Sequence, residues 1–162
     1  MKVKRRIRII IVIAVIITTF TNFCICYGKQ FFDKLDLAIN WSINIPMPQN
    51  STTIFAFDFK EGQDFKIWTL NEKSIKKIIK NPLWNEINNS NIKDINNKCL
   101  KFSNLLDEKE QEKYKSAVGM DVLNVKTGQY FLYKSQKNKP DNYIFLILDK
   151  DRNKVYYMLN IF

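Results

Sequence analysis

One apolar run near the C-terminus constrains the fold more than any other feature. Tyr143 to Leu148 is apolar at every position. Successive side chains of a strand point to opposite faces of its sheet, so a strand without polar positions has to be covered on both faces. We therefore expect this run to form a central strand.

Other segments alternate apolar and polar residues as strands do, with turn residues between them. A hairpin of 53–59 and 64–70 is predicted, because Phe55, Phe57 and Phe59 share one face of the first run. A shorter alternation covers Trp41 to Ile45. The last third of the chain is expected to hold strands at Asp121–Lys126, Gln129–Lys134, Asn142–Leu148 and Lys154–Phe162, with hairpin turns at Thr127-Gly128 and Asp149–Asn153.

Two main helices are expected between these groups of strands. Glu72–Lys80 follows a capping residue, Asn71, and Glu108–Val118 follows a capping-box pair, Asp107 and Glu110. This order of elements predicts an α+β fold. We expect an antiparallel sheet of about six strands with the two main helices on one face, preceded by an N-terminal transmembrane or signal helix.

Shorter elements are predicted on either side of the first main helix. We expect a helical turn near Leu83 to Ile87 and a loop over the Asn-rich stretch Asn88–Asn97. A short amphipathic helix is expected at Gln30–Asn40. Its apolar residues at helical spacing are Phe31, Phe32, Leu35 and Ile39. This helix is expected to rest either on a bilayer or on the domain.

The N-terminus has the pattern of an export or membrane-anchoring segment. Five basic residues lie within positions 2–8 and precede the apolar run Ile9–Ile17, which continues less strictly to Tyr27. Basic flanks of such segments stay in the cytoplasm. We therefore expect a single-pass protein of the cell membrane, with the N-terminus inside and the C-terminal domain outside.

Retention of this segment and its cleavage are both considered. Ile9–Ile17 has the length of a signal-peptide core, about 7 to 15 residues, while the run to Tyr27 reaches the roughly 20 residues of a spanning helix. Cys24-Ile25-Cys26 is the nearest match to a cleavage site. We expect a retained anchor, with secretion after cleavage as the alternative. The predicted domains are a signal anchor or signal peptide at 1–28, a juxtamembrane amphipathic segment and linker at 29–50, and an extracytoplasmic α+β domain at 51–162.

Composition excludes several classes of site. The chain contains no His, which rules out Ser-His-Asp and Cys-His catalysis and zinc sites that need imidazole. Cys99 is the single cysteine after position 28, so it is expected to be a small buried residue. Asp149 to Asn153 begins like a calcium loop, but Lys154 stands where the loop needs glycine, and we expect a polar turn. We predict no cofactor and no metal.

The net charge of +10 comes partly from the N-terminal flank. Five of the 26 basic residues precede the apolar run, which leaves 21 basic against 16 acidic residues, a net charge of +5. This moderate excess outside the cytoplasm gives no reason to expect nucleic-acid binding. The abundance of Ile, Lys and Asn is typical of an AT-rich bacterial genome.

Carboxylates offer one catalytic alternative. The acidic residues of 107–112 lie in the first turns of one predicted helix, where they complement its dipole. Asp58 and Asp121 are better candidates for a glycan hydrolase, which needs two carboxylates across a cleft.

A stripe of lysines is the sharpest candidate binding site. The stripe consists of Lys73, Lys76, Lys77 and Lys80, at the i, i+3, i+4 and i+7 positions of one helix face. Four ammonium groups together would attract an anionic lipid, a wall polymer or an acidic protein. The solvated outer face of an amphipathic helix has the same spacing.

The leading expectation is a small, membrane-anchored, extracytoplasmic bacterial protein that binds another envelope protein without catalysis, as an accessory subunit, an inhibitor or an immunity factor. One alternative is an envelope glycan hydrolase that uses carboxylates. The other is an electrostatic tether that holds anionic wall polymer or lipid through the lysine stripe.

Overall fold

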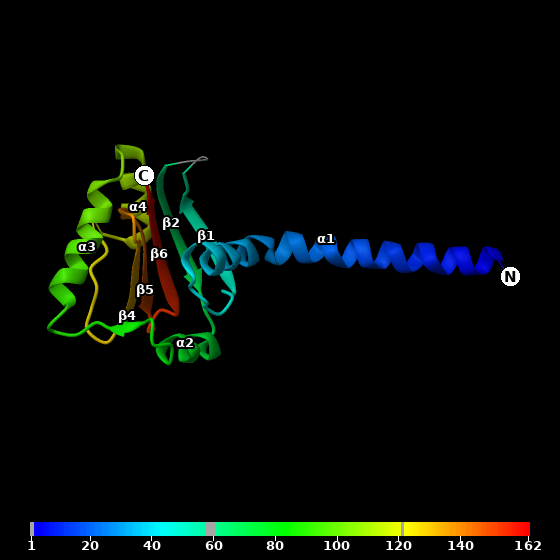
Figure 1. Ribbon diagram of the computed structural model, residues 1–162, viewed down its shortest axis with the longest axis horizontal. Helices are drawn as coiled ribbons and strands as arrows, with labels where there is room; N and C mark the ends of the chain where they lie inside the picture. Colours follow the sequence, from blue (N-terminus) through cyan, green and yellow to red (C-terminus); the bar gives the residue numbers. More distant parts are fainter. Residues whose placement is uncertain (1, 58–60, 121) are drawn as a thin grey trace.

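The computed structural model describes residues 2–57, 61–120 and 122–162, and within its first helix the side chains of residues 12, 13, 15–19, 21 and those from 27 onward. The chain forms a sheet with helices against it and one long helix that projects from the domain (Figure 1). The elements are α1 (Lys2–Trp41), β1 (Asn50–Phe55), β2 (Gly62–Thr69), α2 (Glu72–Ile79), β3 (Asn85–Glu86), α3 (Ile92–Asn104), α4 (Glu108–Val118), β4 (Tyr130–Gln136), β5 (Lys139–Asp149) and β6 (Lys154–Ile161). Within the described part of the chain, no helix combines the length and the apolar character needed to cross a membrane.

The sheet is antiparallel and has six strands in the order β1-β2-β6-β5-β4-β3. The predicted α+β class and antiparallel sheet are therefore confirmed. β5 lies between β4 and β6, and its run from Asn142 to Asp149 is buried throughout. The fully apolar strand is central, as expected, because neither of its faces can meet water without exposing apolar side chains.

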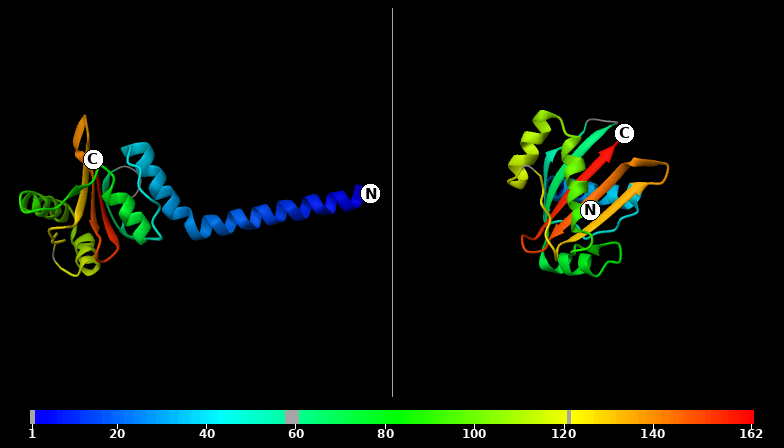
Figure 2. Two further views of the ribbon diagram at one scale, coloured as in Figure 1. Left: turned by 90° about the horizontal axis from the view of Figure 1, so that it is seen from below. Right: turned by 90° about the vertical axis from the view of Figure 1, so that its left-hand side faces the viewer.

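The prediction that both main helices share one face of the sheet is wrong. α1 and α2 cover one face and α3 and α4 cover the other (Figures 1 and 2). β5 supplies both cores, with Ile144, Leu146 and Leu148 on the α1–α2 side and Phe145 and Ile147 on the α3–α4 side. Two-sided burial of this strand requires helices on both faces, so the fold has three layers.

Both main helices begin where their caps predict. The Asn71 side chain accepts a hydrogen bond of 2.8 Å from the Ser74 backbone N–H at the start of α2. At the start of α4, Asp107 and Glu110 each accept a hydrogen bond from the other's backbone N–H, at 2.8 and 3.2 Å. These bonds satisfy backbone donors that have no partner inside the helix.

The Asn-rich stretch is a loop only at its start, because α3 begins within it at Ile92. Ile95, Cys99 and Phe102 recur at helical spacing and are fully buried against the sheet. Asn has a weak helix propensity, but burial of this apolar face outweighs it.

Two predicted strands are absent from the described residues. In the first, 41–45, α1 continues to Trp41 and ends there. Ser42 has a positive φ of 50°, and the Ile43 N–H donates a hydrogen bond of 2.9 Å to the Leu37 carbonyl. In the second, residues 122–126 form no strand, so the turn at Thr127-Gly128 joins no hairpin. Side chains accept hydrogen bonds from this part of the backbone instead. The N–H of Leu123 donates to the Tyr114 hydroxyl, and the N–H of Val125 donates to the Asn96 side chain.

The structure also tests the two predicted hairpins and the predicted helical turn near Leu83. β1 and β2 form the predicted hairpin, although β1 begins at Asn50 and ends at Phe55. The turn at Asp149 to Asn153 joins β5 to β6 as predicted. Of the helical turn expected near Leu83 to Ile87, one hydrogen-bonded turn forms, in which the Trp84 N–H donates to the Asn81 carbonyl at 3.0 Å. The short strand β3 follows this turn and pairs with β4.

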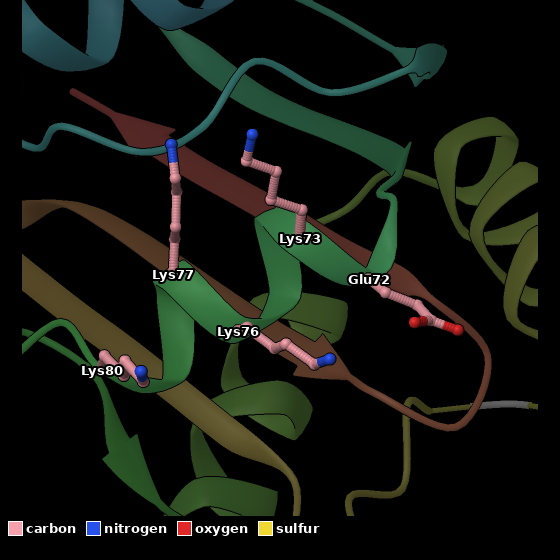
Figure 3. Close-up of a pocket in the computed structure, with 5 residues that line it drawn as sticks. All are labelled: Glu72, Lys73, Lys76, Lys77 and Lys80. Carbon is pink, nitrogen blue, oxygen red and sulfur yellow. The ribbon is translucent and has the colours of Figure 1, made fainter.

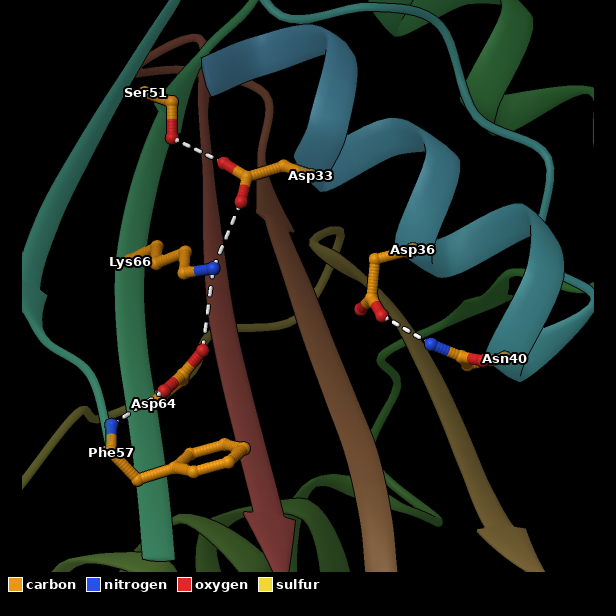
Figure 4. Close-up of polar contacts among 7 residues, drawn as sticks. All are labelled: Asp33, Asp36, Asn40, Ser51, Phe57, Asp64 and Lys66. Carbon is orange, nitrogen blue, oxygen red and sulfur yellow. Dashed lines mark hydrogen bonds and ion pairs between the residues drawn. The ribbon is translucent and has the colours of Figure 1, made fainter. Parts of the chain in front are cut away.

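The end of α1 is a structural part of the domain. Leu37 and Trp41 are buried in the same core as Ile43 and Ile45, which follow the helix. A cluster of charges then ties α1 to β2 (Figure 4). The Lys66 ammonium lies 2.9 Å from Asp33 of α1 and 3.3 Å from Asp64 of β2.

All three side chains of this cluster are largely buried, with exposed fractions of 14% for Lys66, 9% for Asp33 and 10% for Asp64. Each carboxylate also accepts a second hydrogen bond, Asp33 from the Ser51 hydroxyl at 2.8 Å and Asp64 from the Phe57 N–H at 3.0 Å. Burial lowers the pKa of Lys66, but the hydrogen bond and charge of Asp33 and the charge of Asp64 outweigh it, and the pKa is raised.

We predict that Lys66→Met destabilises the fold strongly, because it leaves two buried carboxylates without their cation. The expected loss is about 3 kcal/mol of unfolding free energy, the low end for breaking a buried ion pair. Urea denaturation of the full chain in detergent micelles measures it. Lys98→Met is the matched control, because its ion pair with Asp94 is more exposed, and it should cost less than about 1 kcal/mol.

The same variant gives a test by pH. A pKa raised on folding contributes stability that is fully present below the unfolded-state pKa and is lost as pH rises through the folded-state value. The stability difference between wild type and Lys66→Met should therefore be constant from about pH 7 to about pH 10 and shrink at higher pH. A difference that already shrinks between about pH 7 and about pH 9 would contradict the role of the ammonium.

A second prediction concerns Cys99, which is free and fully buried, as the sequence indicated. Burial raises the pKa of its thiol to about 12, so the reactive thiolate is scarce. In a Cys24→Ser plus Cys26→Ser variant, a thiol reagent should modify Cys99 at least about 100-fold faster in urea than in the native protein. Equal rates in the two conditions would show that the α3 face is not packed as described.

Candidate functional site

The carboxylates considered for catalysis are Asp58, Asp121 and the acidic residues of 107–112. Asp58 and Asp121 lie outside the described residues. On α4, Asp107 and Glu110 form the capping box at the surface, so these acidic groups stabilise the start of a helix.

The Asp149 carboxylate contacts a residue of its own turn, Arg152. The Asp149 carboxylate accepts a hydrogen bond of 3.2 Å from the Arg152 N–H and lies 3.8 Å from the Arg152 guanidinium. This is the turn chemistry that the sequence favoured over a calcium loop. Among the described residues, no three His, Cys, Asp or Glu side chains lie close enough together to hold a metal ion.

The lysine stripe lies on the outer side of α2. Ile75 and Ile78 are buried beneath the helix, so the opposite face points to solvent. All four lysines are exposed, and none of them makes an ion pair within the described part of the chain. Their charges are therefore available to an anionic partner.

The four ammonium groups do not all point the same way. Lys73 and Lys77 extend together toward the segment that follows α1, while Lys76 and Lys80 leave the helix on another side (Figure 3). The stripe and Glu72 line an open hollow of about 390 Å³. Four like charges around an open hollow can concentrate anions.

The basic surface extends from α2 to α1. Lys77 and Asn81 share a second hollow, of about 320 Å³, with Lys34 of α1 and with Asn44 and Pro46 from the segment between α1 and β1. Asn81 donates a hydrogen bond of 3.4 Å to the Asn44 carbonyl, which links this segment to the end of α2. Sequence reasoning missed Lys34, because its proximity to α2 depends on how α1 docks.

A second candidate surface lies at the first strand of the sheet. β1 has β2 as its one neighbour among the described strands, so its other edge carries unpaired backbone groups. Beside β1, an open groove of about 500 Å³ is bordered by α4. Its lining residues are Thr53, Ile54, Glu112, Lys113, Ser116 and Ala117.

This edge is poorly protected against pairing. Many natural edge strands carry Lys or Pro, or are very short. β1 has six residues without a charge or a proline. Its one protective feature of this kind is a register shift between Thr53 and Phe55, since irregular pairing twists an edge strand. The opposite edge ends in β3, which has two residues and includes Glu86. The sequence predicted a strand near β1, but its place at the edge follows from the sheet order.

Comparison of the chain with protein-family models, with curated proteins and with solved structures finds no match.

Proposed function

We propose that this chain is a small extracytoplasmic bacterial protein, anchored at the cell membrane through its N-terminal segment, that binds a protein partner without catalysis. Accessory subunits, inhibitors and immunity factors act in this way. The basic flank and apolar run of 2–27 support export, because this charge pattern keeps the N-terminus in the cytoplasm.

The β1 edge, which carries no charge and no proline, is the observation that carries the protein-binding part of the proposal. An extended segment of a partner can pair with such an edge through backbone hydrogen bonds, while its side chains enter a neighbouring groove. The groove against α4 lies beside this edge, with Ile54 and Ala117 as apolar lining and Glu112 and Lys113 as charged lining. Such a site binds one extended chain and needs no reactive group.

The pairing would place the partner at the end of the existing sheet. Thr52, Thr53 and Ile54 have the branched side chains that favour extended backbone. β1 pairs with β2 in one register from Asn50 to Thr53, and the register shifts before Phe55. A strand with a fixed register offers a fixed sequence of donors and acceptors, which gives the partner one preferred alignment.

We predict that Ser116→Arg weakens partner binding. Ser116 is exposed and lines the groove, so a long side chain there fills the space beside β1 without entering the core. Tagged full-length protein should crosslink one stoichiometric protein in native envelopes, identified by mass, with crosslinks at β1 or α4. Ser116→Arg should reduce its recovery by about tenfold or more, which is about 1.4 kcal/mol of binding free energy.

Ser135→Arg is the matched control, because Ser135 is exposed on β4 at the other end of the sheet. It should leave recovery unchanged. Equal losses for both variants would contradict a site at β1, and turnover of a wall glycan or peptide by the purified protein would contradict a non-catalytic role.

A further inference from the structure

The end of α1 is apolar on two opposite faces. One face, with Leu37 and Trp41, is buried in the domain core. The other carries Phe31, Phe32, Leu35 and Ile39, which we call the outer stripe. The side chains of Phe32 and Ile39 are 66% and 68% exposed, and those of Phe31 and Leu35 are 43% and 40% exposed.

The outer stripe contains the apolar residues from which the sequence predicted an amphipathic helix. They do not contact the domain core, because Asp33 binds Lys66 and turns the opposite face of the helix toward the sheet. Single exposed apolar residues are common on protein surfaces. Four exposed apolar residues together, on a helix whose other face is already buried, indicate a surface that is covered by a membrane or by another apolar surface.

The surroundings of the outer stripe favour a lipid surface. α1 continues from the outer stripe toward the N-terminus without interruption, and its exposed residues there include Val12, Val15 and Ile16. Within this part, the Thr19 and Thr21 hydroxyls donate to the carbonyls of Val15 and Ile17, one turn earlier. Hydroxyl groups bonded in this way need no water, which suits them to a low-dielectric environment.

The charges beside the outer stripe have the sign that anionic lipids attract. Lys29 is exposed on the same part of α1, and Lys34 borders the hollow that reaches Lys77. Of the nearby carboxylates, Asp33 is paired with the Lys66 ammonium, while Asp36 accepts a hydrogen bond from the neutral amide of Asn40. An apolar helix face flanked by lysines is the usual design of helices that lie in the plane of a membrane surface.

The shape of α1 agrees with this orientation. The helix bends where it reaches the domain, so the part that carries the outer stripe runs at an angle to the projecting part (Figure 2). α2 lies on the same side of the sheet as the end of α1 (Figure 1), and its lysine stripe is exposed to solvent. A bilayer that receives the outer stripe would therefore also come close to the basic face of α2.

We infer that the outer stripe inserts into the surface of an anionic bilayer and that the lysines of α1 and α2 bind the lipid headgroups. This contact orients the domain with α1 and α2 toward the membrane and leaves the β1 edge and its groove for a partner. The inference goes beyond the proposed function, because the outer stripe lies after Tyr27 and remains in the chain whether the N-terminal segment is kept or cleaved.

Spin-label accessibility tests the contact on the full chain. In the Cys24→Ser plus Cys26→Ser background, Cys99 is buried, so a nitroxide can be attached at Ile39→Cys alone. The control label is at Lys109→Cys, which is exposed on α4 across the sheet. The probes are vesicles of mixed phosphatidylglycerol and phosphatidylcholine, with dissolved oxygen and a water-soluble nickel complex as collision reagents.

We predict that the label at position 39 collides with oxygen several-fold more than with the nickel complex, and that the label at position 109 shows the reverse. Equal nickel accessibility at both positions would overturn the inference. A label at position 39 that is shielded from both reagents would overturn it too, since it would show that a second copy of the chain covers the outer stripe.

The charge contribution is tested separately by Lys76→Glu plus Lys77→Glu, both of which are exposed and unpaired among the described residues. This change and a rise in salt should each lower the oxygen preference at position 39, because both weaken attraction to anionic headgroups. An oxygen preference that neither change affects would overturn the assignment of headgroup binding to the lysines. The partner assay with Ser116→Arg is independent of this result, so failure of one proposal does not imply failure of the other.

Discussion

The structure depends on the burial of β5 from both sides. Alternate residues of this strand belong to two separate cores, one under α1 and α2 and one under α3 and α4. A strand without polar positions gains stability only when both faces are removed from water, at roughly 25 cal/mol per Å² of apolar surface. β6 has the same requirement, with Val155 and Tyr157 in one core and Tyr156 and Met158 in the other. Because both central strands are buried on both faces, the helices are divided between the two faces of the sheet.

The segment from Gln30 to Ile45 follows the basic and apolar start of the chain and belongs to the folded domain. Its residues Leu37, Trp41, Ile43 and Ile45 are buried. These residues complete the α1–α2 core. The Lys66 cluster fixes which face of α1 meets the sheet. Charges held in pairs between two elements specify one arrangement where apolar contacts alone would allow several.

Two kinds of surface result from this arrangement, and they lie in different places. The basic face of α2 and the outer stripe of α1 share one side of the sheet, whereas the groove between β1 and α4 lies beside an edge. Under the two proposals, lipid and partner would not compete for one site. A lipid contact on the α1–α2 side would hold the β1 edge at a constant orientation to the membrane, which favours capture of a partner in the same membrane by raising its effective concentration.

The sequence by itself determined the features that depend on neighbours a few residues apart. Asn71 and Asp107 start their helices because a cap needs only the next three residues, and the β1–β2 hairpin follows from alternation on either side of a turn. The helical spacing of the lysine stripe is local in the same way. Tertiary structure decided what depends on distant partners. α3 forms in an Asn-rich stretch because its residues Ile95, Cys99 and Phe102 pack against the sheet. Residues 122–126 remain irregular because Tyr114 and Asn96 accept hydrogen bonds from their backbone. It also decided the face of α1 that docks and the position of β1 at the edge, since a sequence pattern can mark a face as apolar or a segment as a strand but cannot say which other element will cover it.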